Sequence, residues 1–505
     1  MRRRQFLKQI SLATSAIACP LLTPRLGAAV KSPFPGKYHP TWESLSRYRA
    51  PEWFRDAKFG IFLHWGVYSV PAHLTEWYPR LMYRRESPVF EWHRQHWGSQ
   101  STFGYKDFIP LFRAERWKPE EWVDLFRRTG AKYIVPVGEH CDGFPMYDSS
   151  LTKWCAAKMG PRRDVVGELA REVRNQRLKL GVSTHRNWHW SWYTYEKDFD
   201  TVNPRYSGLY GKPHPPAPPI DNRPGEILEL APVTFLQDWY ARTIEIVNKY
   251  EPDLVWLEWG VQGPGFEPYR KQLAAYYYNR AEAWRRGVVL THKGNGFPPH
   301  AAVFDMERGA PGTARALPWQ AENSISKKSW GYIEDDEYSS PSDIIHELVD
   351  IVSKNGNLLL NVGPESDGTI PEKAVELLGQ IGRWMEVNGE AIYGTRPWKV
   401  WHEGRNTFKR GSFNESKTAL PQFTARDIRF TTRGRAIYAI FLAWPGREAR
   451  IRSLGSKSPY TPAKISAVRL LGENNRLRWR RTPDALIIYT PPRRPCDYAF
   501  AFKIT

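Results

Sequence analysis

The sequence is poor in cysteine and in acidic residues. Four cysteines occur in 505 residues, and Cys19 falls in an N-terminal apolar stretch. Cys141, Cys155 and Cys496 are an odd set without CxxC spacing. They therefore predict neither a disulfide framework nor a zinc site.

Acidic residues are outnumbered, with 53 Asp and Glu against 73 Lys and Arg, so the net charge is +20. A basic surface attracts polyanions. The basic residues are spread along the chain, however, and no nucleic-acid module is recognisable. This argues against a nucleic-acid partner. It leaves a solvated basic surface or, as the sharper hypothesis, an anionic glycan substrate such as a sulfated one.

The only long apolar run lies at the N-terminus, from Ile10 to Leu22, and no other segment could cross a bilayer. Arg2-Arg3-Arg4 precedes the run and Gly27-Ala28-Ala29 follows it. This pattern is typical of a twin-arginine export signal cleaved near residue 29, with a lipid-modified Cys19 as the alternative. We expect residues 1–29 to be a signal peptide and the protein to be periplasmic or extracellular.

Short apolar runs alternate with amphipathic helices between about residues 50 and 390. Residues 119–129 predict a helix, with Pro119 in its first turn and Gly130 at its end. Such βα alternation predicts an α/β fold in which a parallel sheet is closed into a (β/α) barrel. We find about seven strands, not eight, and this count is compatible with an irregular barrel. We place this domain at 30–392 and an antiparallel β-sandwich at 393–505, where short β-type runs are separated by turns.

Catalytic groups of such barrels lie at the carboxyl ends of the strands. The predicted strand ends carry histidine, acidic and tryptophan residues, the types that bind sugar hydroxyls and stack on sugar rings. The null hypothesis for a single such residue is a structural role, but coordinated strand ends favour a site. The candidate sugar-binding residues are His64, Trp65, Glu76, Trp77, His140, His185, Trp256 and Lys293.

A glycosidase needs two carboxyl groups that flank the scissile bond. Glu258 follows an apolar strand between Trp256 and Trp259, and Glu307 ends a neighbouring strand beside Arg308. We predict that these two form the catalytic pair, with Glu322 as the alternative acid. For Glu307, an ion pair with Arg308 that shapes a loop is an equally good interpretation.

Five ordered blocks resemble the α-L-fucosidases of glycoside hydrolase family 29. They are WFRDAKFGIFLH (53–64) followed by Glu76-Trp77, EHCDGF (139–144), PDLVWLE (252–258), SWGY (329–332) and NLLLNVGP (357–364). The resemblance implies a distorted barrel with a β-sandwich, no cofactor or metal, and retention through a glycosyl-enzyme intermediate. It implies that His64, Glu76, Trp77 and His140 hold the fucose hydroxyls, that Trp256 lines the ring, and that Glu258 is the nucleophile.

Three positions depart from the family pattern. Glu258 stands where the family has aspartate, Cys141 replaces the second of two histidines, and Trp188 stands where related sequences tend to have glutamate. Three interpretations remain beside a fucosidase. One is an enzyme for another L-sugar or a substituted fucose, and another is a glycan-binding relative that has lost catalysis. A metal-dependent hydrolase using His64, His140 and His185 is a third, although no HxH or HExxH spacing occurs.

Overall fold

The computed structural model describes residues 36–215, 231–408, 410–413, 421–460, 462 and 464–505. The predicted signal peptide at 1–29 lies outside these residues. Within them, no helix combines the length and the apolar character that a membrane span requires.

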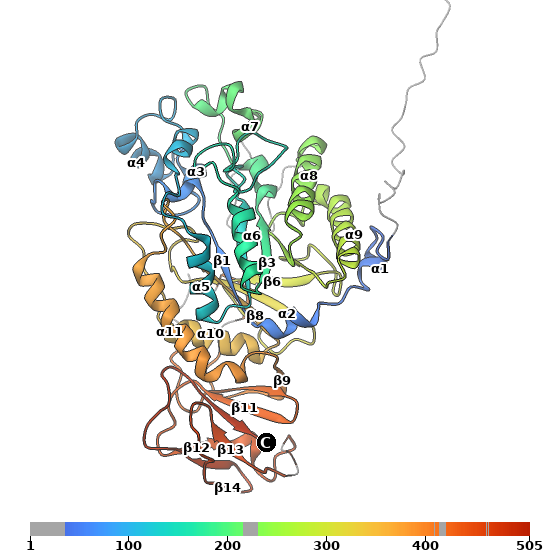
Figure 1. Ribbon diagram of the computed structural model, residues 1–505, viewed down its shortest axis with the longest axis vertical. Coiled ribbons are helices and arrows are strands. Elements are labelled where there is room, and N and C mark those ends of the chain that lie inside the picture. Colours follow the sequence, from blue (N-terminus) through green and yellow to red (C-terminus); the bar gives the residue numbers. More distant parts are fainter. Residues whose placement is uncertain (1–35, 216–230, 409, 414–420, 461, 463) are drawn as a thin grey trace, which may run out of the picture.

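Eight parallel strands form a closed barrel in sequence order (Figure 1). The strands are β1 (Phe59–Leu63), β2 (Tyr133–Glu139), β3 (Lys179–Thr184), β4 (Leu254–Leu257), β5 (Val289–His292), β6 (Val303–Glu307), β7 (Trp319–Ser324) and β8 (Gly356–Val362). The predicted barrel is therefore confirmed. The count of about seven strands was wrong by one, because β7 was not recognised.

Strand β7 escaped recognition because polar residues occupy its inward positions. Gln320 accepts a hydrogen bond from the hydroxyl of Tyr133 at 2.8 Å and donates one to Asp305. Glu322 pairs with Lys293. A strand that contributes polar side chains to the barrel interior lacks the apolar run by which buried strands are identified.

Helices surround the barrel. The longer ones are α4 (Pro88–His96), α5 (Pro119–Thr129), α6 (Val165–Asn175), α8 (Val233–Tyr250), α9 (Glu267–Ala283), α10 (Pro341–Ser353) and α11 (Glu372–Asn388). Helix α5 has the predicted bounds: Pro119 occupies its first turn, and Gly130 ends it at a φ of 102°, a left-handed conformation that favours glycine. Short helices α1 (Trp42–Leu45), α2 (Glu52–Ala57), α3 (Tyr78–Leu81) and α7 (Ser207–Tyr210) lie in the connections.

Two antiparallel sheets follow the barrel, in the order β13-β16-β11-β10-β9 and β12-β15-β14. Their strands are β9 (Arg396–Glu403), β10 (Ile428–Arg433), β11 (Ala436–Phe441), β12 (Glu448–Ile451), β13 (Val468–Leu470), β14 (Trp479–Arg481), β15 (Leu486–Tyr489) and β16 (Phe500–Ile504). Side chains of both sheets share one hydrophobic core. Figure 1 shows these sheets beneath α10 and α11.

A buried ion pair joins the two parts. Asp350 on α10 lies 2.6 Å from Nε of Arg429 on β10 and 2.6 Å from Nζ of Lys354, and all three side chains are fully buried. Burying charge is costly unless it is paired. The pairing therefore fixes the C-terminal sheets against the barrel.

Candidate active site

Seven barrel strands bring polar side chains to one end of the barrel. His64, His140, His185, Glu258 and Lys293 stand at or just after the ends of β1 to β5, Glu307 ends β6, and Glu322 lies in β7. All strands of a parallel barrel point the same way, so their carboxyl ends meet on one face. The predicted residues therefore lie in one place.

Lys293 is the centre of this group. Its Nζ lies 3.2 Å from Oε1 of Glu258 and 2.6 Å from Oε2 of Glu307, and it also contacts Glu322. The lysine side chain is only 1% exposed, and its ammonium group stands 4.7 Å from the centre of the Trp256 ring. One buried cation is thus shared by three carboxyl groups.

This shared cation limits the separation of Glu258 and Glu307. Oε1 of Glu258 lies 3.2 Å from Nζ of Lys293, and Oε2 of Glu307 lies 2.6 Å from it. The distance between these two oxygens therefore cannot exceed the sum of the two, 5.8 Å. The side chains of Glu258 and Glu307 are 16% and 12% exposed, whereas Glu322 is 1% exposed. A ligand can therefore reach the first two acids, while Glu322 lies behind them.

Glu258 is held as a carboxylate. Its Oε2 lies 3.1 Å from Nδ1 of His185, and its Oε1 accepts a hydrogen bond from the backbone N–H of Trp259 at 2.6 Å. Burial by itself would raise the pKa of Glu258, but Lys293, His185 and the Trp259 N–H outweigh it and lower the pKa to about 2. Glu258 is therefore ionised at neutral pH.

Glu307 is oriented by two donors to the same oxygen. The indole Nε1–H of Trp259 donates to its Oε2 at 2.7 Å, and Lys293 lies 2.6 Å from that oxygen. With Oε2 engaged in this way, Oε1 is the oxygen that can carry a proton to a ligand.

Two further acids beside Lys293 favour the protonated form. Burial raises the pKa of Glu322 well above its ordinary value, and the neighbouring carboxyl groups add to this effect, while Lys293 opposes it. Burial also raises the pKa of Asp305 to about 7 against the influence of Lys293, Gln320 and Trp256. Asp305 accepts a hydrogen bond from the indole of Trp256 at 3.2 Å and so fixes that ring.

Three histidines form a wall of the site beside Glu258. The ring centroids of His140 and His185 lie 4.8 Å apart, and those of His64 and His185 lie 5.2 Å apart. Burial lowers the pKa of His64 and of His140 well below the ordinary value, so both rings are neutral. Nδ1 of His140 is buried and has no hydrogen-bond partner among the described residues. Neutral imidazoles can both donate to and accept from sugar hydroxyls.

The same three rings offer one potential ligand atom each, and these atoms lie within 4.8 Å of one another. Neutral imidazole is a common ligand of zinc and related ions. The histidines therefore fit a metal ion as well as a sugar.

Trp65 does not join the site, which corrects that prediction. Its ring packs against Phe112, Trp117 and Trp122, and its indole donates to the carbonyl of Glu365 at 2.7 Å. Successive side chains of an extended chain point to opposite sides, so Trp65 faces the helices when His64 faces the barrel.

Glu76 and Trp77 lie in the loop after β1. Oε2 of Glu76 accepts hydrogen bonds from Thr75, Ser329 and the backbone N–H of Trp330, each at 2.9 Å. Glu76 thus ties two loops together through one oxygen. Trp77 is partly buried, and its ring lies 5.9 Å from that of Trp188.

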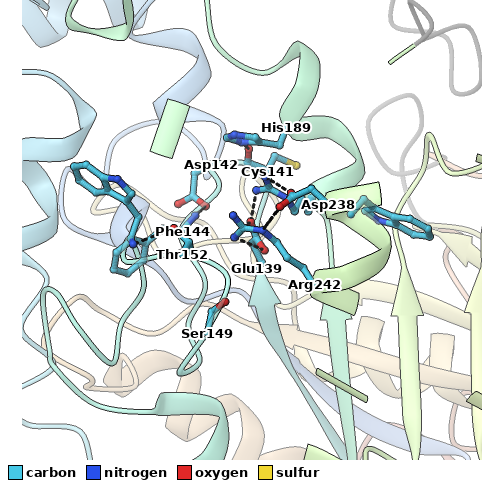
Figure 2. A network of polar contacts seen from close by, with 12 residues as sticks. Glu139, Cys141, Asp142, Phe144, Ser149, Thr152, His189, Asp238 and Arg242 are labelled. Atoms are coloured by element: carbon cyan, nitrogen blue, oxygen red, sulfur yellow. Dashed lines mark hydrogen bonds and ion pairs between the residues drawn. The ribbon is translucent and has the colours of Figure 1, made fainter. Parts of the chain in front are cut away.

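A largely buried network of charges supports the ends of β2 and β3 (Figure 2). Glu139, which ends β2, pairs with Nη1 of Arg186 at 2.6 Å and with Arg242 at 3.3 Å. Asp238 pairs with both arginines. Because Glu139 precedes His140 and Arg186 follows His185, the network fixes the backbone that carries these two histidines. Sequence reasoning missed Asp238 and Arg242, whose helix α8 gives no sign of a contact with distant strand ends.

The loop after β2 contains Cys141 and Asp142. Figure 2 shows His189 above this loop, where its Nδ1 donates to the Cys141 carbonyl at 2.9 Å. Asp142 accepts a hydrogen bond from Tyr105 at 2.6 Å and one from the backbone N–H of Phe144 at 3.1 Å. Burial raises the pKa of the Cys141 thiol, so it stays neutral. These groups stabilise the loop.

Comparisons with known proteins identify the family to which the chain is similar. The family described as alpha-L-fucosidase matches residues 27–390, and the alpha-L-fucosidase C-terminal domain matches residues 422–505. The tissue alpha-L-fucosidase of Rattus norvegicus is 32% identical and that of Homo sapiens 31%; the alignments cover 93% of this chain and 93% and 92% of those proteins. The crystal structure of Thermotoga maritima alpha-fucosidase is 30% identical with a TM-score of 0.72, covering 93% of this chain and all of that one.

A barrel of eight parallel strands with paired acids at its carboxyl end, together with these matches, defines a glycoside hydrolase. The family match spans well over half of the chain. The protein therefore belongs to the α-L-fucosidase family, as the sequence motifs predicted.

The neutral state of Glu322 predicts a pH-dependent effect of Glu322→Gln on stability. The folded pKa is raised above the ordinary value of 4.5, so wild-type stability from this group is fully present below that value and declines as pH rises. Glutamine mimics the neutral acid and does not titrate. The melting temperature of Glu322→Gln relative to wild type should therefore rise between about pH 4.5 and pH 7.5. A difference that stays constant over this range would contradict a protonated Glu322.

Proposed function

We propose that the protein is an exo-acting α-L-fucosidase that hydrolyses terminal α-L-fucosides with retention of configuration. Glu258 is the nucleophile and Glu307 is the acid and base. The supporting observation is that both acids contact Lys293, with their contacting oxygens within 5.8 Å. Retaining glycosidases hold the two carboxyl groups about 5–5.5 Å apart, and inverting ones about 6.5–9.5 Å.

In the first step Glu258 attacks the anomeric carbon, and the bond from that carbon to the leaving oxygen breaks. Glu307 gives its proton to this oxygen. In the second step Glu307 takes a proton from water, the water oxygen bonds to the anomeric carbon, and the Glu258 carboxylate departs. The two steps together hydrolyse one glycosidic bond.

Lys293 suits both steps because it contacts both acids. Glu258 is negative and Glu307 neutral before the first step, and their charges are exchanged after it. The ammonium group of Lys293 is 3.2 Å from Glu258 and 2.6 Å from Glu307. It therefore faces one charged carboxylate both before and after the first step. An electrostatic environment that is already in place requires little reorganisation during reaction.

The sugar itself would lie against the histidine wall. His64, His140 and His185 are placed to contact hydroxyl groups, and Trp256 offers a ring fixed by Asp305. Glu76 joins them through Oε1, because its three hydrogen bonds reach Oε2. Three donors hold Glu258 in position, which supports a nucleophile with one methylene more than the family's aspartate.

The sequence supports two further proposals, one about the substrate and one about the location of the enzyme. The net charge of +20 favours an anionic, sulfated glycan as substrate. The run Arg2-Arg3-Arg4 and the apolar stretch after it favour export by the twin-arginine pathway to the periplasm or the exterior.

Glu258→Gly should lower kcat/KM on an aryl α-L-fucoside by at least about a thousandfold, because no group remains to attack the anomeric carbon. Sodium azide should restore turnover and yield the β-fucosyl azide, identified by NMR. Glu282→Gln, at an exposed acid paired with Lys37, is the matched control and should retain wild-type rates. Full activity of Glu258→Gly would exclude this nucleophile. A wild-type protein that binds fucosylated glycans but hydrolyses none would instead be a binding relative.

Glu307→Ala should lower the rate of hydrolysis most for substrates whose leaving oxygen must be protonated. Loss of a general acid costs about 10²–10⁴-fold on a fucosyl disaccharide, whose leaving oxygen is basic. A dinitrophenyl fucoside, which leaves without protonation, should lose far less in the rate of the first step. Glu322→Gln serves as the comparison: if it shows this leaving-group dependence and Glu307→Ala does not, Glu322 is the acid.

The spacing of the three histidines supports one other candidate, a metal-dependent hydrolase. A chelator separates the two functions. Prolonged dialysis against EDTA should leave the turnover of the aryl fucoside unchanged if the histidines bind the sugar. Loss of turnover that added Zn²⁺ restores would establish the metal-dependent reaction.

A further inference from the structure

A short segment of the connection between β9 and β10 reaches the active site. The N–H of Phe413 donates to the carbonyl of Glu307 at 3.1 Å, and the N–H of Gly411 donates to that of Ala310 at 3.1 Å. The backbones are so close that a side chain at Gly309 would collide with the Gly411 carbonyl. Residues 410–413 are therefore joined to the chain directly after β6, where Glu307 stands.

An aromatic pair marks this contact. The rings of Phe413 and Trp259 are stacked, with centroids 6.1 Å apart and an angle of 29° between their planes. Trp259 follows Glu258 in the sequence, and its indole donates to Glu307. Both aromatic residues are only partly buried, so they have surface left for a ligand.

Phe413 adopts an unfavourable backbone conformation. Its φ is 58°, in the left-handed region that bulky residues rarely occupy. Such strained conformations are concentrated at functional sites. The strained residue is the same one whose ring packs against Trp259. The strain is therefore a second reason, beside the ring contact, to assign Phe413 a function.

We propose that Phe413 and Trp259 form the subsite for the leaving group, so that a segment from beyond the barrel determines which glycan or aryl group is removed. This inference rests on the proposed function of Glu307. An acid that protonates the leaving oxygen must stand beside it, and the rest of the leaving group extends past that acid. Trp259 donates to Glu307, Phe413 stacks on Trp259, and the N–H of Phe413 donates to the Glu307 carbonyl, so both aromatic residues border the acid.

The chemistry of the subsite suits a ring. Sugar rings and aryl groups present flat apolar faces that pack on aromatic side chains. Phe413 adds such a face without a hydrogen-bonding group, so it binds by shape and area. The leaving group is therefore a pyranose or an aryl ring rather than a small or linear group.

The test compares two substrates that need no acid. Dinitrophenyl fucoside has an aromatic leaving group, whereas fucosyl fluoride has none, and both leave without protonation. In Phe413→Ala the ratio of kcat/KM for the aryl fucoside to that for the fluoride should fall about three- to tenfold, the usual effect of one aromatic contact. Phe413→Tyr, which keeps the ring, should preserve the ratio.

The matched control is Phe408→Ala, which removes another aromatic ring of the same connection. Phe408 packs against Phe423, with centroids 5.4 Å apart. If either substitution only destabilised the C-terminal part, kcat/KM would fall equally for both substrates, and the ratio would stay unaltered. An unchanged ratio in Phe413→Ala, or an equal fall in Phe408→Ala, would overturn the subsite. If wild type hydrolyses neither substrate, the proposed function itself fails, and the subsite with it.

Discussion

One buried ammonium group holds the active site together. Lys293 follows β5, and the barrel places β4 and β6 on either side of that strand. A side chain at this position therefore reaches Glu258 after β4 and Glu307 at the end of β6, and β7 supplies Glu322 one strand further. Acids from three strands could not be buried together without a cation among them. The order of the strands and the charge of the lysine thus determine the site jointly.

The protonation states follow from this geometry. Lys293 and His185 keep Glu258 ionised, burial keeps Glu322 protonated near neutral pH, and burial raises the pKa of Asp305 to about 7. The proposed mechanism starts with a proton on Glu307, so that one negative group, Glu258, faces one positive group, Lys293. This is the state from which a retaining glycosidase begins, with a charged nucleophile and a neutral acid. Because Glu322 is neutral, Lys293 does not have to balance a charge on that acid as well.

The sequence predicted the parts that depend on local patterns. Apolar runs and helix ends located most of the barrel, and the rule of strand ends found Glu258, Lys293 and Glu307. The same rule misplaced Trp65, because it takes no account of the side to which each residue points. It passed over β7, whose inward residues Gln320 and Glu322 are polar.

Other features depend on contacts between distant segments and carry no local signal. Phe413 meets Trp259 only because the connection after β9 returns to the barrel. Asp305 could have been found, since it lies two residues before Glu307 and so on the same face of β6. The pairing of Glu139 with Arg242 required the position of α8.

The departures from the family pattern fall on two sides of the site. On the side of β4, the longer Glu258 is held by donors from Lys293, His185 and Trp259. On the side of β2 and β3, Cys141 and Trp188 pack in or against the hydrophobic core. Cys141 follows His140, and the N–H of Trp188 donates to the carbonyl of His185 at 3.1 Å. Both positions therefore adjoin the histidines to which the proposed function assigns the sugar hydroxyls.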